Sequence, residues 1–345
     1  MKYILFCTNS YSFAILSPFV EIFKQNKYEW VWFVDKKILN TFPFINQKFT
    51  SKISELKLFR SDVILVPGNE VPHYLRGVKA QVFHGFAGEK KGHFRIREYF
   101  DIYLTQGPYF TKEFKKLKNI HKNFEVKETG WPKLDYLFDK KFLLEKSKLI
   151  KEHQVKKIIL YAPTFSPKLT SADYVLPEID KISQENSDLL FLVKFHPLMD
   201  KKFIRICEEI DSVNKNVILV KDQNILKSLC ISDLLISDTS SSIYEFLLLD
   251  KPVISFKNIS KNILWQNFSK ISELKSLINN NLSLDPFKNN RKIIFDNYHP
   301  YKDGRSTIRV INSLDDYIKR HGVPNNRKLS LYRKIKIFLK FGFNN

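Results

Sequence analysis

One segment, residues 232–246, constrains the fold more than any other part of the sequence. An apolar run leads to Asp238, the hydroxyl cluster Thr239–Ser242 follows, and an amphipathic helical pattern comes next. This order predicts a strand, a tight turn and the start of a helix. A further apolar run at 252–255 predicts the next parallel strand of a βαβ unit. Unpaired backbone N–H groups and hydroxyls at such a turn bind phosphate, so we expect a nucleotide-handling α/β protein.

The rest of the chain repeats this alternation of short apolar runs and longer amphipathic segments, which is typical of doubly wound α/β domains. Its 345 residues, 43% of them apolar, are enough for two such domains. The predicted strands are 3–7, 29–34, 63–66, 81–83 and 102–105 in the first half, and 157–161, 189–195, 217–220, 234–237 and 252–255 in the second. A charged, strand-poor stretch at 136–155 reads as a linker. We therefore predict one domain at 1–140, a second at 150–322 and a separate tail at 323–345.

The net charge of +21 favours an acidic partner, which can be a nucleotide, a phosphorylated lipid or polymer, an anionic membrane surface or nucleic acid. Zinc-ligand spacing and aromatic–glycine RNA-binding motifs are missing from the sequence, so we expect no nucleic-acid partner. The three cysteines, Cys7, Cys207 and Cys230, lack metal-ligand spacing and read as reduced thiols. Because the sequence has no apolar run of 18 residues and no signal-peptide pattern, we expect a cytoplasmic location.

The tail is basic and amphipathic. It carries six cations and no acidic residue, and four apolar residues fall near one helical face: Leu331, Ile335, Phe338 and Leu339. This pattern predicts a helix that lies on the anionic inner face of the cell membrane. The alternative is an ordinary terminal helix that packs on the body of the protein.

Two histidines stand where predicted strands end. His84 closes the run at 81–83, and His196 closes the run at 189–195. The carboxyl ends of parallel strands are where α/β proteins bind ligands, and an imidazole can take a proton from a hydroxyl. Taken alone, His84 is better explained as a structural loop histidine, and His196 is equally compatible with a capped strand end. The pair, one in each half, favours a cleft between two domains.

Two further positions offer polar groups next to predicted strands or helices. Thr164 follows the strand at 157–161, although Pro163 alone explains a turn there. Arg305 precedes the last long helical pattern and could contact a phosphate, whereas Asp303 or Ser306 could simply cap that helix. The sequence holds no Walker-type glycine loop, no GxGxxG and no Asp-x-Asp. We therefore expect transfer chemistry that relies on helix N-termini and basic residues, with no metal and no cofactor apart from the nucleotide-activated donor.

Six short motifs occur in a specific order along the chain: QVFHG at 81–85, YFDIYL at 99–104, GWPKLD at 130–135, ILYAPTF at 159–165, FHP at 195–197, and the block from 233 to 252. Together they resemble the motifs of the CDP-glycerol glycerophosphotransferase family, which includes teichoic-acid primases, teichoic-acid polymerases and capsule relatives. The resemblance extends from about residue 63 to residue 309.

The resemblance implies a GT-B fold, with two Rossmann-like domains that face a central cleft, and a donor nucleotide held by the C-terminal domain. It implies that His84 is the general base on an acceptor hydroxyl and that His196 contacts the donor pyrophosphate. The other implied donor-binding residues are Thr164, Asp238, Ser240, Ser241, Ser242 and Arg305. The implied reaction transfers glycerol phosphate from CDP-glycerol to a glycan or lipid-linked acceptor, with CMP as the leaving group.

Three other functions remain open at this point. The first is a GT-B glycosyltransferase that uses a nucleotide sugar for capsule or lipopolysaccharide. The second is an enzyme like the UDP-N-acetylglucosamine 2-epimerases, to which the DGRS motif at 303–306 is also similar. The third is a non-catalytic basic protein that binds membranes or nucleic acid, which would explain the charge but not the two histidines at strand ends.

Overall fold

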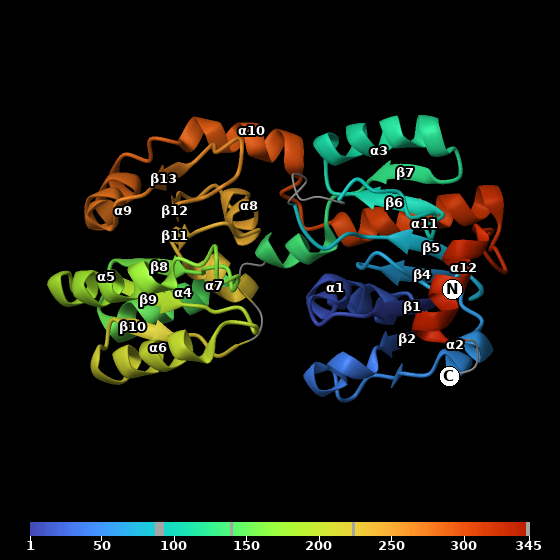
Figure 1. Cartoon of the computed structure of the whole chain (residues 1–345), viewed down its shortest axis with the longest axis horizontal. Coiled ribbons are helices and arrows are strands. Elements are labelled where there is room, and N and C mark those ends of the chain that lie inside the picture. Colours follow the sequence, from blue (N-terminus) through green and yellow to red (C-terminus); the bar gives the residue numbers. More distant parts are fainter. Residues whose placement is uncertain (87–92, 139–140, 223–224, 343–345) are drawn as a thin grey trace. The chain divides into compact units, whose positions relative to one another are not determined.

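A computed structural model of the chain describes residues 1–86, 93–138, 141–222 and 225–342. The chain divides into two compact units (Figure 1). The first unit contains Met1–Phe138 and Asn297–Asn345, and the second contains Asp139–Asp296. The two expected doubly wound domains are therefore present, but the chain returns to the first unit after it has completed the second.

The first unit is built on a parallel seven-stranded sheet of order β3-β2-β1-β4-β5-β6-β7. Its strands are β1 (Lys2–Cys7), β2 (Glu29–Val34), β3 (Phe49–Thr50), β4 (Val63–Val66), β5 (Val78–Gln81), β6 (Ile102–Thr105) and β7 (Glu125–Glu128). The central strands read as continuous apolar runs because helices cover both of their faces. The strand order reverses between β1 and β4, so the loops that follow these strands separate at the position where doubly wound folds bind ligands.

Two layers of helices cover this sheet. They are α1 (Tyr11–Gln25), α2 (Ile53–Phe59), α3 (Pro108–His121), α11 (Ser306–His321) and α12 (Leu331–Phe341), together with the short η1 (Lys36–Thr41) and η2 (Pro132–Phe138). On one face, α1, η2 and α11 contact one another. On the other face, α12 buries Ile337 and Phe341 in the same core cluster as α2. The ring of Phe341 packs edge-on against Phe6 of β1.

The second unit has a parallel six-stranded sheet of order β10-β9-β8-β11-β12-β13. Its strands are β8 (Lys157–Tyr161), β9 (Leu189–Val193), β10 (Val217–Leu219), β11 (Leu234–Ser237), β12 (Val253–Phe256) and β13 (Gln266–Phe268). Its helices are α4 (Lys141–His153), α5 (Ala172–Glu185), α6 (Lys201–Val213), α7 (Ile225–Ile231), α8 (Ser242–Leu247), α9 (Leu274–Ser283), the 3-10 turn η3 (Ile271–Glu273) and α10 (Lys288–Tyr298), which runs across the boundary into the first unit. The strand order reverses between β8 and β11.

The structure corrects the predicted domain limits. The stretch at 136–155, predicted as a charged, strand-poor linker, contains α4, which contacts α7 of the second unit. The second domain ends at Asp296, not at residue 322, because α11 packs against η2 and α1 of the first unit. The segment at 323–345, predicted as a separate tail, belongs to the first unit as well.

Most predicted strands are confirmed within one or two residues, with one informative exception. The run at 81–83 was expected to be a strand, but β5 ends at Gln81, and Phe83 adopts a left-handed backbone conformation with φ of +57°. This turn carries the following residue, His84, out of the line of the strand. In the part of the chain that the structure describes, no helix is both long enough and apolar enough to span a bilayer.

Candidate functional sites in the two units

His84 lies just beyond the carboxyl end of β5, beside the point where the strand order of the first sheet reverses. Its side chain is exposed, and its Nδ1 lies 2.9 Å from the carbonyl oxygen of Pro67, in the loop after β4. A carbonyl can only accept, so Nδ1 carries the proton and the lone pair of the neutral ring lies on Nε2. Tyr11, at the start of α1, stacks on the imidazole with 5.1 Å between ring centroids. His84 is therefore held in the form of a base.

Side-chain hydrogen bonds join the loops around His84 to one another. Gln81, at the end of β5, donates to the carbonyl of Gly68 at 3.0 Å and to Asn69 Oδ1 at 3.3 Å. Gln106, after β6, donates to the carbonyl of Gly85 at 2.8 Å. These buried amides fix the loops that follow three neighbouring strands, so the position of His84 is set by the sheet edge and not by its own loop alone.

His196 lies just beyond the carboxyl end of β9 in the second unit. Its strand lies on the β8 side of the strand-order reversal, whereas β5 lies on the β4 side of the reversal in the first sheet, and the ring of His196 is held in the opposite form. The backbone N–H of Leu198 donates to its Nδ1 at 3.1 Å. Nδ1 must therefore be unprotonated, and the neutral ring carries its proton on Nε2. Burial and the nearby charge of Lys194 lower the pKa of His196, which keeps the ring neutral. Phe165 stacks on the ring with 4.4 Å between centroids. His196 is an N–H donor.

Asp238 is a buried residue that fixes neighbouring loops of the second unit through hydrogen bonds to its carboxylate. Its side chain is fully buried, and Oδ1 accepts from the backbone N–H of Thr164 at 2.8 Å. Oδ2 accepts from the backbone N–H and the hydroxyl of Ser171, both at 3.0 Å. Burial raises the pKa of Asp238, while these hydrogen bonds act against the rise. The sequence predicted that Asp238 binds the donor directly; with both oxygens turned into the protein, it instead positions the loop that carries Thr164 and Phe165.

The hydroxyl turn at 239–242 has the predicted place between a strand and a helix. Ser240 Oγ lies 2.8 Å from Ser242 Oγ and accepts weakly from the backbone N–H of Ser242 at 3.3 Å. Ser241 occupies the N-cap position of α8, and its side chain makes no capping bond. The helix has only six residues, so its dipole is smaller than the sequence pattern suggested. Thr164 is partly exposed.

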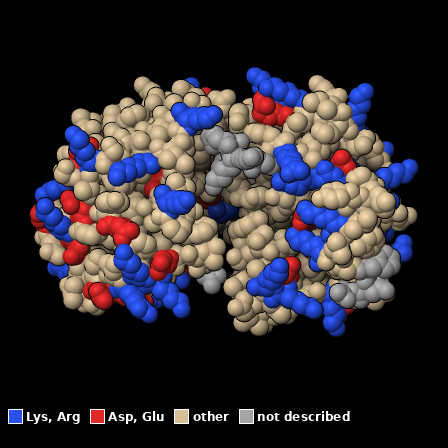
Figure 2. Space-filling model, in the orientation of Figure 1, with Lys and Arg blue, Asp and Glu red and all other residues tan. Residues whose placement is uncertain are grey.

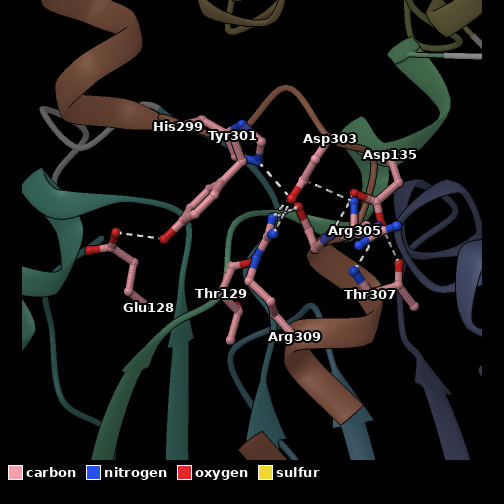
Figure 3. Close-up of polar contacts among 10 residues, drawn as sticks. Glu128, Thr129, Asp135, His299, Tyr301, Asp303, Arg305, Thr307 and Arg309 are labelled. Carbon is pink, nitrogen blue, oxygen red and sulfur yellow. Dashed lines mark hydrogen bonds and ion pairs between the residues drawn. The ribbon is translucent and has the colours of Figure 1, made fainter. Parts of the chain in front are cut away.

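Arg305 is not part of the second unit, contrary to the prediction. It lies in the first unit at the N-cap position of α11, and its side chain is exposed. The expected cap, Asp303 or Ser306, is also wrong. Asp135 of η2 caps the helix instead, accepting from the backbone N–H groups of Ser306 and Thr307 at 2.9 and 2.8 Å (Figure 3). The cap comes from 171 positions earlier in the chain, which local spacing cannot reveal.

The same close-up shows residues that sequence reasoning did not assign. Arg309 Nε donates to the carbonyl of Thr129 at 2.8 Å, and Nη1 pairs with Asp303 at 2.7 Å (Figure 3). Tyr301 donates to Glu128 at 2.8 Å, and the guanidinium of Arg309 lies over its ring, 3.9 Å from the centroid. This network attaches the returning chain to the end of β7. It accounts for the GWPKLD and DGRS motifs as two halves of one junction.

Gly130 shows why this junction needs a glycine. Its φ is +78°, and a Cβ atom there would lie 2.5 Å from Ser306 Oγ and 3.0 Å from His299 Nε2. Any side chain would push α11 away from β7. The Gly at the start of the GWPKLD motif was the available sequence signal, but its partner could not be identified from spacing. Among the described residues, no group of three or more His, Cys, Asp or Glu side chains could hold a metal ion.

Comparisons with known proteins identify the family to which the chain is similar. The family model described as CDP-glycerol:poly(glycerophosphate) glycerophosphotransferase matches residues 13–260. The teichoic acid ribitol-phosphate polymerase TarL of Staphylococcus aureus is 29% identical over 255 residues, 66% of this chain and 44% of the relative. The teichoic acid glycerol-phosphate primase of Bacillus subtilis is 26% identical over 239 residues, 65% of this chain and 61% of the relative. The chain thus spans about half the length of these relatives.

Solved structures support the fold across both units. The wall teichoic acid polymerase TagF superposes with a TM-score of 0.68 at 16% identity, covering 93% of this chain and 89% of that one. The UDP-GlcNAc 2-epimerase of Neisseria meningitidis superposes with a TM-score of 0.60 at 14% identity, covering 92% and 100%. The expected GT-B fold of two Rossmann-like domains is confirmed. With the family model matching most of its length, the chain belongs to the CDP-glycerol:poly(glycerophosphate) glycerophosphotransferase family.

Proposed function

We propose that the chain transfers a phosphopolyol, glycerol phosphate, from CDP-glycerol to a hydroxyl of a glycan or lipid-linked acceptor in the synthesis of a cell-surface polymer. Family membership supports the reaction type. The relatives support the class of polymer, since they are named as a ribitol-phosphate polymerase and a glycerol-phosphate primase of teichoic acid. The observation that carries the proposal is the hydrogen bond from His84 Nδ1 to the carbonyl of Pro67, because it makes Nε2 the basic nitrogen of the ring and a transferase acting on a hydroxyl needs a general base.

The proposed reaction is a direct displacement. The acceptor oxygen attacks the β-phosphorus of CDP-glycerol, a new P–O bond forms, and the bond between that phosphorus and the bridging oxygen breaks. CMP leaves with the electron pair of that bond, and the acceptor proton passes to Nε2 of His84 and then to water. Positioning and charge stabilisation supply most of the rate enhancement in such phosphoryl transfers.

The second unit supplies groups suited to the donor. His196, with its proton on Nε2, can donate to a phosphate oxygen without carrying a charge of its own. The hydroxyls of Thr164 and Ser240–Ser242 can donate to the same diphosphate. Asp238 holds the Thr164 loop in place. Arg305 lies in the first unit, and its contact with a phosphate stays a prediction. We propose that these groups act without a resident metal or cofactor.

We further propose that the protein is cytoplasmic and binds the inner face of the membrane through α12. Ile337 and Phe341 are buried, and Phe338 of the predicted face stacks on Tyr74, as the packed-helix alternative requires. The other three residues of the predicted face are exposed. Leu331 and Leu339 are 73% and 84% exposed, and Ile335 lies between them. Apolar side chains in such a row, beside lysines, suit the headgroup region of an anionic bilayer.

The donor is tested by calorimetry with CDP-glycerol, CMP, UDP-glucose and UDP-N-acetylglucosamine, each with and without EDTA. We expect CDP-glycerol and CMP to bind with affinities that EDTA leaves unchanged, and uridine nucleotides to bind at least about tenfold more weakly. Tighter binding of a UDP-sugar would replace this function with the glycosyltransferase or epimerase reading. If no nucleotide binds, the assignment of a transferase fails.

Membrane binding is tested by sedimentation with vesicles of phosphatidylcholine alone or with added phosphatidylglycerol. We expect the protein to pellet only with the anionic vesicles, and the variant L331S/I335S/L339S to stay in the supernatant. The matched control is L143S/L144S, which removes two exposed leucines from α4. Equal loss of binding in both variants, or no binding by the wild type, would contradict the role of α12.

A further inference from the structure

The carbonyl that orients His84 belongs to the segment between β4 and β5, residues 67–75. The first residue of this segment, Pro67, accepts the hydrogen bond from His84 Nδ1 at 2.9 Å. The next two residues are fixed from the strand side, because Gln81 donates to Asn69 Oδ1 at 3.3 Å and to the carbonyl before it at 3.0 Å. Residues later in the segment contact a different element, the C-terminal helix α12.

Glu70 makes the charged contact between this segment and α12. Lys336 Nζ donates to one oxygen of its carboxylate at 2.5 Å, and Lys340 Nζ donates to the other at 2.6 Å. The two lysines lie one helical turn apart, which lets both reach the same carboxylate. The Glu70 side chain is 15% exposed, against 52% and 43% for the two lysines, so water only partly screens the contact.

Apolar and aromatic contacts accompany these ion pairs. Val71 is fully buried in the same core cluster as Phe341 of α12. Tyr74 stacks on Phe338 with 5.2 Å between ring centroids, and its hydroxyl donates to the carbonyl of Gly342, just after the helix. The segment that begins with the acceptor of His84 is therefore attached to α12 along its later half.

The helix α12 is basic and belongs to a basic unit, so the carboxylates that it contacts matter for its attachment. On the face drawn in Figure 2, lysine and arginine side chains predominate over acidic ones across the first unit. The helix itself carries four cations and no acidic residue, and like charges repel one another. Among the described residues, the carboxylates that pair with α12 are Glu70 and Glu98, the latter with Arg333 at 3.2 Å. Only Glu70 lies in the segment that orients His84.

We propose that Glu70 is a positioning residue for His84, because its ion pairs with Lys336 and Lys340 attach α12 to the segment that fixes the tautomer of the base. The proposal rests on the proposed function only in taking His84 as that base. With the attachment intact, the carbonyl of Pro67 meets Nδ1, and Nε2 is the basic nitrogen. Without it, the segment moves, and an imidazole that lacks a fixed acceptor exchanges its proton between both nitrogens. The molecules that carry this proton on Nε2 cannot take a proton from a hydroxyl there.

The experiment records long-range ¹H–¹⁵N correlation spectra of the full chain labelled at histidine, above neutral pH, with the signals of His84 assigned by His84→Ala. In K336M/K340M and in E70Q, we expect the two ring nitrogens of His84 to move toward a common shift, because the proton divides its time between them. The signals of His196, in the second unit, should not change. The matched control is K328M/K334M, which removes two other lysines of the C-terminal segment, neither of them paired with a carboxylate in the described part of the chain.

Transfer kinetics give a second readout on the same variants. K336M/K340M and E70Q should each lower kcat by about three- to tenfold, the range expected for two partly exposed ion pairs, while calorimetry shows unchanged affinity for CDP-glycerol. The combined variant E70Q/K336M/K340M should be no worse than either parent, because all three remove the same contact. Urea denaturation of each variant confirms that the first unit is folded.

The outcomes separate this proposal from the proposed function. If the two nitrogens of His84 keep their separate shifts in both variants, Gln81 alone positions the Pro67 carbonyl and the proposal is wrong, whatever happens to kcat. If K328M/K334M changes His84 as much as K336M/K340M does, the cause is the loss of positive charge and the role of Glu70 is overturned. If the shifts average as expected in a protein whose wild type transfers nothing from CDP-glycerol, the positioning role stands and the proposed function fails.

Discussion

Each unit places a histidine just beyond the carboxyl end of a parallel strand, and the two units give this histidine opposite chemistry. His84 and His196 each follow a central strand of a parallel sheet, and each is exposed and stacked on an aromatic ring. The difference lies in the backbone group that meets Nδ1, a carbonyl for His84 and an N–H for His196. One backbone atom thus decides whether the exposed edge of the ring accepts a proton or donates one.

The two backbone partners also differ in their distance along the chain. His196 takes its hydrogen bond from Leu198, two positions later, in a turn that Pro197 helps to form. His84 reaches Pro67, which is 17 positions earlier and belongs to the neighbouring strand's loop. The donor form is therefore a local property of the sequence, whereas the base form depends on the assembled sheet. A change that loosens the loops of the first unit should affect His84 and leave His196 unchanged.

The largest expected effect comes from His84→Ala. Loss of a general base lowers the rate by about 10²–10⁴-fold, so transfer should fall by that factor while affinity for CDP-glycerol changes little. His84→Gln should fail equally, because an amide cannot take up a proton. A variant that keeps more than a tenth of wild-type turnover would show that another group is the base.

Acid should weaken the first unit more than the second. Burial lowers the pKa of His299 to about 4, whereas an unfolded histidine titrates near 6.5. The stabilisation is complete above pH 6.5 and is lost as the pH falls from 6.5 to 4, because only the unfolded chain then takes up the proton. The loss for this group is roughly 3 kcal/mol.

Hydrogen exchange at pH 7.5 and pH 5 tests whether acid destabilises the first unit more than the second, since it reports the two units separately. On going from pH 7.5 to pH 5, protection should fall more in β1 and β4 than in β8 and β11. In His299→Gln the two sheets should lose protection to a more similar extent. The second unit contains His153, which is half-buried, and His196, which is exposed. Equal loss of protection in both sheets would show that buried histidines do not control acid stability.

His196→Ala should have a smaller effect than removal of the base. The variant loses one donor to the proposed diphosphate, so CDP-glycerol affinity should fall by roughly 10–100-fold, as for a hydrogen bond to a charged group. His196→Gln should recover much of this, since an amide N–H can replace Nε2–H. Recovery of function by His196→Gln but not by His84→Gln would show that one histidine donates a hydrogen bond and the other takes up a proton. Recovery by both glutamine variants would refute this difference.

The smallest effect concerns the junction that returns the chain to the first unit. Asp135→Ala removes the cap of α11 and should lower the free energy of unfolding of the first unit by about 1–2 kcal/mol, as for other N-cap losses. Urea denaturation measures it. The control is Asp200→Ala, which removes the local cap of α6 in the second unit. If only the control destabilises the protein, the contact between Asp135 and α11 is not a structural cap.

The sequence predicts the elements of this fold well wherever the signal is a buried apolar run. Strands such as β2, β4 and β11 were predicted at their observed bounds, because both faces of these strands are covered. The edge strands β7 and β13 were missed. β7 reads EVKE and β13 reads QNF, and neither carries an apolar run. The return of the chain was also missed, because Asp135 and the helix it caps are 171 positions apart in the sequence.

The candidate residues were found by their place at strand ends, but their roles depend on contacts that spacing does not contain. Asp238 is an example, since an Asp before a hydroxyl turn reads as a ligand contact, while its two oxygens in fact accept from Thr164 and Ser171.

The most direct test of the account is the tautomer of each histidine. Long-range ¹H–¹⁵N correlation spectra of protein labelled at histidine, recorded above neutral pH and assigned with His84→Ala and His196→Ala, identify the protonated nitrogen of each ring. We predict a proton on Nδ1 of His84 and on Nε2 of His196. If both rings carry the proton on the same nitrogen, or if the assignments are reversed, the division into a base and a donor is wrong.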